Sequence, residues 1–233
     1  MIKLNILAAR VPRMTHAQYA RYAKDNHARL VLGTEPVSRY LTGYVQQHVF
    51  DAAYGVNAPA WRYDSVSHIF ARSAEDMSAA TATREYREII APDEPSFADS
   101  RSASFTMVEE VPLALQVRGY SSLRLLHYGC ASDDGAAATL AGQWTVAHEA
   151  VIARSPRVLD PVRRAVINRA LPGPGGERPG FDVMGELGFL EHSDVAAIGD
   201  YVAMMEEALG PLLDRDRSFF LLAEAIPVRG TLS

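Results

Sequence analysis

The sequence predicts an α+β protein made of two tandem ferredoxin-like units, each with the element order β-α-β-β-α-β. Three observations predict this architecture. Strand-like and helix-like segments follow one another in that order twice, short segments recur at matching places, and a histidine occupies the same place on the first helix of each half. We place the two units at residues 1–114 and 121–230, joined by a linker at 115–120.

The first half contains six segments with the signals of regular structure. Its first helix begins with Thr15 and Gln18 at the spacing of a capping box, and neither Gly nor Pro interrupts the residues that follow. A loop with Gly, Asn and Pro at 51–62 separates the second strand from the third. The predicted elements are strands at 2–8, 40–50, 63–71 and 104–111, and helices at 15–31 and 73–90.

The second half repeats this order. The predicted elements are strands at 122–130, within 157–170, at 181–190 and at 218–226, and helices at 135–154 and 193–213. Tyr-Asp at 63–64 recurs as Phe-Asp at 181–182, and Ser-Phe at 104–105 recurs as Ser-Phe at 218–219. His148 follows His27 by 121 positions, the spacing that also separates Ile2 from Leu123. These coincidences favour a duplicated unit.

Each unit would have a four-stranded sheet with both helices on one face, so its other face must be covered. The two halves can cover each other within one chain. We therefore expect the chain to fold as a monomer. Sheet edges would remain open in this arrangement, so a homodimer is also possible.

The first helix carries His27 on its apolar face. Tyr19, Ala23, Asn26 and Leu30 recur at helical spacing, and His27 follows Ala23 by four residues. A single histidine on a helix is more often a satisfied core or boundary residue than a functional group. The strand that follows is what favours a functional site here.

The strand at 40–50 has an unusually polar face. Period-two alternation places Tyr40, Thr42, Tyr44, Gln46 and His48 on one side. Two phenols, an amide and an imidazole are uncommon in a core. They suit a pocket in which a few polar groups orient a ligand against apolar walls.

The second half lacks this polar face. The positions 121 residues after Tyr40, Tyr44 and His48 are occupied by Pro161, Ala165 and Arg169. Trp144 replaces Ala23, and it could fill the second pocket. We therefore assign the principal site to the first half and treat His148 and Arg169 as candidates in a degenerate second site.

Residues 2–31, followed by Tyr-Leu-Thr-Gly-Tyr-Val-Gln-Gln-His-Val at 40–49, resemble the EthD family. The most specific part is Tyr-x-x-x-x-His-x-x-Leu-Val, from Tyr22 to Val31. The resemblance implies small ferredoxin-like domains that pair as a dimeric α+β barrel, here within one chain. It also implies an activity among lyases and isomerases, in secondary metabolism or aromatic catabolism.

Histidine and tyrosine side chains on these two elements suit cofactor-independent acid–base chemistry. Two imidazoles can divide the roles of acid and base, and a phenol can donate to a developing oxyanion. The predicted catalytic residues are His27, His48 and Tyr44, and the predicted substrate-binding residues are Tyr40, Tyr22, His68, Trp61 and Asn26.

We expect the substrate to be a small aromatic or polyketide-like molecule. The reaction would be a dehydration, a decarboxylation, a cyclisation or an isomerisation. A cofactor-free oxygenase and a non-catalytic small-molecule binding protein are the alternatives.

Composition argues against several other classes. The net charge of −5 and the lack of a basic stripe disfavour nucleic acids and anionic membranes as partners. A single cysteine, Cys130, permits no internal disulfide and fits a reducing cytoplasm. No apolar run approaches the roughly 20 residues that span a bilayer. Nucleotide-binding and metal-ligand spacings are also lacking, so we expect neither a cofactor nor a metal.

Overall fold

The computed structural model describes residues 2–50, 63–113, 121–155, 162–173, 175–189 and 195–230. The predicted loop at 51–62 and the predicted linker at 115–120 lie outside these ranges. Within them, the strands and helices follow the predicted order with shifted bounds.

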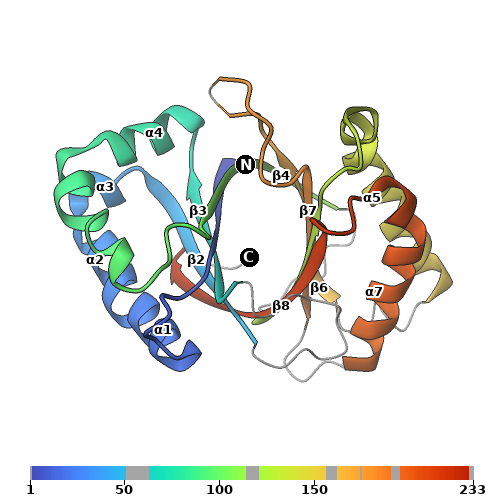
Figure 1. The fold of residues 1–233 in the computed structure, drawn as a ribbon, viewed down its shortest axis with the longest axis horizontal. Helices are drawn as coiled ribbons and strands as arrows, with labels where there is room; N and C mark the ends of the chain where they lie inside the picture. Colours follow the sequence, from blue (N-terminus) through green and yellow to red (C-terminus); the bar gives the residue numbers. More distant parts are fainter. Residues whose placement is uncertain are drawn as a thin grey trace.

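Eight strands form one closed barrel, with the helices on its outside (Figure 1). In the first half the elements are β1 (Ile2–Ala8), α1 (His16–Tyr22), η1 (Ala23–His27), α2 (Ala28–Gly33), α3 (Glu35–Ser38), β2 (Leu41–Val49), β3 (Ser65–Ala71), α4 (Ala74–Ala82), η2 (Tyr86–Ile90), η3 (Glu94–Ser96) and β4 (Ser104–Pro112). In the second half they are β5 (Leu123–Gly129), α5 (Asp134–Arg154), β6 (Val162–Ala170), β7 (Val183–Phe189), α7 (Val195–Leu209), η4 (Gly210–Leu212) and β8 (Phe219–Arg229).

The strands of the two halves have the same spatial order. The first half runs β4-β1-β3-β2 and the second runs β8-β5-β7-β6. The two sheets join where β2 pairs with β8 and where β4 pairs with β6, both antiparallel. Because the barrel is closed, each of these eight strands pairs with a neighbour on both sides. None of the eight therefore has the open edge that was expected from the sequence.

Helices of the two halves cover opposite sides of the barrel (Figure 1). The helices α1, α2 and α4 lie against the strands of the first half, and α5 and α7 lie against those of the second. Among the described helices, none combines the length and the apolar character needed to cross a bilayer.

The first predicted helix starts as expected but changes its winding. The Thr15 hydroxyl accepts from the Gln18 N–H at 3.2 Å, and the Gln18 side chain accepts from the Thr15 N–H at 2.8 Å. Further along, a π-helical turn at η1 bonds the Ala28 N–H to the Ala23 carbonyl. This turn adds about one residue to the helical repeat.

The π-turn changes which residues face inward. The buried residues after Ala23 are Ala28 and Val31, whereas the expected Asn26 is exposed and Leu30 is half-buried. The uninterrupted α-helical spacing of inward-facing residues that the sequence predicts is therefore wrong beyond Ala23. His27 lies at the boundary between the buried stripe and the solvent.

Side chains inside the barrel include a buried ionic cluster. Lys3 donates to Glu110 at 2.8 Å and to Glu186 at 3.3 Å. Arg124 pairs with Glu186 at 3.2 Å, and Arg164 pairs with Glu110 at 2.8 Å. Since Lys3 and Glu110 belong to the first half and the other three to the second, the cluster joins the two sheets across the barrel.

Candidate active site

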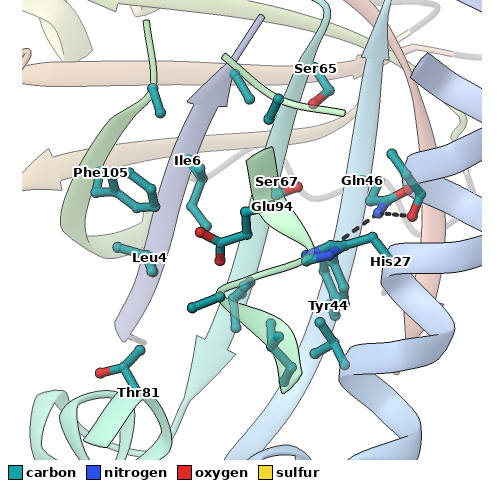
Figure 2. A pocket seen from close by; sticks show the side chains of 18 of the residues that line it. Leu4, Ile6, His27, Tyr44, Gln46, Ser65, Ser67, Thr81, Glu94 and Phe105 are labelled. Atoms are coloured by element: carbon teal, nitrogen blue, oxygen red, sulfur yellow. Dashed lines mark hydrogen bonds between the residues drawn. The ribbon is translucent and has the colours of Figure 1, made fainter. Parts of the chain in front are cut away.

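A cavity of about 300 Å³ lies between the helices of the first half and the outer face of its sheet (Figure 2). This volume lies at the lower end of the range for small-molecule sites. Most of its walls are apolar, from Leu4 and Ile6 on β1 to Phe97 after η3 and Phe105 on β4. The polar side chains that line it are those of Tyr19, His27, Tyr44, Gln46, Ser65, Ser67, Thr81, Tyr86, Glu94 and Ser100.

His27 enters this cavity from the π-helical turn and is fixed by a carboxylate. Its Nδ1 lies 2.9 Å from Oδ2 of Asp93, and its ring packs 4.9 Å from that of Phe97. The other oxygen of Asp93 accepts from the Tyr22 hydroxyl at 2.6 Å. A carboxylate at Nδ1 favours the tautomer with its proton there, which leaves Nε2 of His27 as the proton acceptor.

Tyr44 projects from β2 into the same cavity. Its hydroxyl accepts from Nε2 of Gln46 at 2.9 Å, and Gln46 also donates to the Ala23 carbonyl at 2.9 Å. Burial raises the pKa of Tyr44 above its usual value. The phenol therefore stays neutral, and its own proton remains available for donation to a ligand.

His48 shares the strand face of Tyr44 but lies outside the cavity lining. Its Nε2 donates to the side-chain oxygen of Gln46 at 3.1 Å. Burial lowers the pKa of His48 to about 4, and the positive charges of His16 and Lys24 act in the same direction. The predicted bracketing of one ligand by His27 and His48 is thus not the observed arrangement, since Gln46 separates His48 from the cavity.

Tyr40 lies outside the cavity lining as well. A β-bulge between Leu41 and Gly43 interrupts the alternation on which its placement rested. As a result Leu41, and not Thr42, lines the cavity together with Tyr44. The Tyr40 ring instead packs with the guanidinium of Arg39 at 5.0 Å.

Three other predicted binding residues lie elsewhere, and one falls outside the described residues. His68 points into the barrel interior, where its ring nitrogens lie 2.9 Å from the Asn5 amide and 2.8 Å from the Gln47 amide. Strand parity places it on the opposite face of β3 from the cavity residues Ser65 and Ser67. The other two, Tyr22 and Asn26, line a shallow groove on the outer side of the helix, and Trp61 is not among the described residues.

Trp144 occupies the centre of the second half in place of a small residue. It is fully buried, and a Cβ at Gly185 would overlap its indole ring. His148 stacks on it at 5.3 Å, with Nδ1 lying 3.0 Å from the Tyr201 hydroxyl. Arg169 is exposed on β6. Neither His148 nor Arg169 is among the described residues that line the cavity around His27.

Sequence reasoning missed Asp93, Glu94 and Tyr86. The Tyr86 hydroxyl donates to Oε1 of Glu94 at 2.9 Å, and both residues line the cavity. Asp93 and Glu94 lie between the predicted helix at 73–90 and the predicted strand at 104–111, where the pair of acidic residues before Pro95 is the only signal of a function. Among the described residues, no group of three or more His, Cys, Asp or Glu side chains could hold a metal ion.

The fold of the chain resembles those of solved proteins with little sequence similarity. A protein described as anthrone oxidase-like aligns with a TM-score of 0.66 and 10% identity, over 100% of this chain and 94% of that one. A mutant chlorite dismutase from Candidatus Nitrospira defluvii aligns with a TM-score of 0.50 and 11% identity, over 97% and 92%. At these identities the likeness shows a common fold. No curated protein matches the sequence.

A family model described as the EthD domain matches residues 11–101. This stretch contains the π-helical turn, β2, β3 and the segment with Asp93 and Glu94, and it supplies most of the cavity lining. Residues 11–101 of this chain are thus similar to the EthD domain.

Proposed function

We propose that the chain is a cofactor-independent enzyme that removes a proton next to a carbonyl group in a small, largely apolar aromatic substrate. The observation that carries this proposal is His27, which lines an apolar cavity while its Nδ1 is fixed by Asp93 at 2.9 Å. A histidine held in this way can act as a general base.

The first step transfers one proton. The C–H bond beside the carbonyl breaks, its proton goes to Nε2 of His27, and its electron pair moves onto the carbonyl oxygen. Asp93 stabilises the imidazolium through Nδ1–H. The Tyr44 hydroxyl donates to the enolate oxygen, and this support is strong because Tyr44 is buried among apolar side chains.

Several outcomes follow from such an enolate. Reprotonation at another carbon gives an isomerisation, and loss of a β-hydroxyl, which takes the proton held by His27 and leaves as water, gives a dehydration. A decarboxylation would instead form the enolate directly, by loss of CO₂ from a β-keto acid. Attack on a second carbonyl gives a cyclisation. We place the chain among these lyase, isomerase and cyclase reactions, of the kind found in secondary metabolism or aromatic catabolism.

A cofactor-free oxygenase is the second candidate. The carbanion form would bond to dioxygen and give a hydroperoxide after protonation. Loss of water from that hydroperoxide leaves a new carbonyl, so CH₂ and O₂ become C=O and H₂O. The apolar cavity, which would admit dioxygen, and the anthrone oxidase-like fold relative support this alternative.

Hydrogen–deuterium exchange tests the shared first step without knowledge of the product. Anthrone in D₂O under nitrogen should exchange its methylene protons faster with the enzyme than without it. The His27→Gln protein, folded as judged by circular dichroism, should lose this acceleration. Admission of air then separates the candidates, because only an oxygenase would consume dioxygen in proportion to product. Tight binding without exchange would instead identify a non-catalytic binding protein.

We also propose that residues 1–114 and 121–230 are two copies of one duplicated unit. The equal strand orders support this, as does a repeated contact at one end of each sheet. Oδ2 of Asp64 accepts from the Arg10 N–H at 2.7 Å, and Oδ2 of Asp182 accepts from the Ala131 N–H at 2.7 Å. Cleavage at a protease site placed within 115–120 should leave the two fragments associated, whereas separation of folded fragments would contradict a shared barrel.

A further inference from the structure

Glu94 places a carboxylate on the wall of the cavity. Figure 2 shows its side chain among Leu4, Ile6 and His27, between β1 and the helix that carries His27. Its Oε1 accepts from Tyr86 at 2.9 Å. The second oxygen, Oε2, has no hydrogen-bond donor within the described part of the chain.

Within the described part of the chain, no Lys or Arg lines the cavity to balance the charge of Glu94, and Glu94 takes part in no ion pair. A ligand that fills the cavity displaces water from this carboxylate. An ionised carboxylate that loses water without gaining a donor is strongly disfavoured.

These observations limit the chemistry of the ligand. An O–H or N–H group on the ligand can satisfy Oε2 through a charge-assisted hydrogen bond. An ether or a bare ring edge cannot satisfy it, and a ligand carboxylate would place two like charges close together in an apolar cavity. Apolar walls around the rest of the cavity suit a flat ring system.

We propose that Glu94 selects neutral ligands that carry a hydroxyl or N–H donor and excludes carboxylates, so that the substrate of this site is a hydroxylated aromatic ketone. The ketone in this statement rests on the proposed function, whereas the selection by Glu94 does not. Glu94 would act on binding, and His27 would act on the chemical step.

Xanthones separate binding from turnover, because they are flat tricyclic ketones without a removable C–H beside the carbonyl. The four monohydroxyxanthones, their methyl ethers and the corresponding carboxylic acids would be titrated calorimetrically. The wild-type protein should bind at least one hydroxyxanthone about 10- to 100-fold more tightly than its methyl ether, as expected for one charge-assisted hydrogen bond. The carboxylic acids should bind more weakly than the ethers.

Three variants test whether Glu94 causes the preference for a hydroxyl group. Glu94→Gln should reduce the hydroxyl preference and improve carboxylate binding, because it removes the charge and keeps an acceptor. Tyr86→Phe keeps the carboxylate and should retain the preference. Glu88→Gln, which neutralises an exposed carboxylate paired with Arg84, should change neither. Thermal melts would confirm that each variant is folded.

Two results would overturn the inference. One is equal affinity of wild-type protein for every hydroxyxanthone and its ether, which would leave the role of His27 intact. The other is failure of every xanthone to bind, which would refute an aromatic ketone as the ligand. Loss of deuterium exchange in the His27→Gln protein alongside the first result would show that only the assignment to Glu94 had failed.

Discussion

His27 and Asp93 are 66 positions apart in the sequence, and their side chains meet at 2.9 Å at the edge of the cavity. The Asp93 carboxylate lies between the imidazole and the Tyr22 hydroxyl, so both of its oxygens are engaged. The ring of Phe97 packs against both partners, 4.9 Å from His27 and 5.3 Å from Tyr22. The imidazole is therefore fixed in position by one carboxylate and one aromatic ring.

Removal of the His27 imidazole should abolish most of the catalysis. His27→Gln should lower kcat by about 10²–10⁴-fold, the usual contribution of a positioned general base. The matched control is His148→Gln, which changes the corresponding histidine of the second half. Steady-state kinetics on both proteins decides between the halves, and a larger loss in the His148 variant would show that the wrong half was chosen.

Asp93 should act through His27. Asp93→Asn presents an N–H to Nδ1 and favours the tautomer protonated at Nε2, which cannot accept the substrate proton. We expect kcat to fall by at least 10-fold with little change in KM. The nitrogen chemical shifts of His27 should report the change of tautomer. If those shifts move while kcat stays constant, His27 is not the base.

Tyr44 should contribute to the chemical step more than to binding. Tyr44→Phe removes one donor to the enolate oxygen, a loss that typically reduces kcat by about 10²–10³-fold. Tyr40→Phe is the control, since Tyr40 lies outside the cavity. Equal effects of the two substitutions on kcat would contradict the oxyanion role.

Buried histidines should make the folded state sensitive to acid. Burial lowers the pKa of His148 in the folded state to about 4 from an ordinary value of 6.5. On acidification the unfolded state takes up the proton first, so stability is complete above about pH 6.5 and is lost as the pH falls towards about 4. This one group should remove roughly 3 kcal/mol from the free energy of unfolding.

Urea unfolding of the wild-type protein and of His148→Gln at several pH values measures this contribution. The variant should show a smaller slope of stability against pH in that window. His127, with a folded-state pKa lowered by burial to about 3, and His48 should account for part of the slope that remains. An unchanged slope in the variant would mean that His148 binds its proton equally well in the folded and unfolded states.

The ionic cluster inside the barrel should stabilise the folded protein. Glu186 contacts Lys3, Arg124 and Arg164, so Glu186→Gln leaves buried positive charge without compensation. We expect a loss of about 3–5 kcal/mol in the free energy of unfolding. Glu207→Gln, at an exposed position of α7, should have little effect. Equal stability of the two variants would show that the cluster is hydrated in solution.

The sequence predicted the local features of the fold well. The capping box at Thr15, the order of strands and helices and the shared face of Tyr44, Gln46 and His48 depend on patterns within a few residues. Their physical causes are hydrogen bonds between near neighbours and the alternation of side chains along a strand. Such causes can be recognised without knowledge of the rest of the chain.

The site was predicted less well, because three of its features depend on irregular or distant structure. A single inserted residue in the π-helical turn exposed Asn26, and a β-bulge removed Tyr40 from the cavity. The pairing of Asp93 with His27 depends on how the segment after η2 returns to the first helix. Neither helical period nor strand parity carries information about such a contact.

A structure of the protein with a bound hydroxyxanthone tests the location of the site most directly. The ligand should fill the cavity of the first half, with its carbonyl oxygen within hydrogen-bonding distance of the Tyr44 hydroxyl and its ring against Nε2 of His27. Its hydroxyl should meet Oε2 of Glu94. A ligand bound beside His148, in the barrel interior near His68, or in the groove formed by Tyr22 and Asn26 would contradict this account.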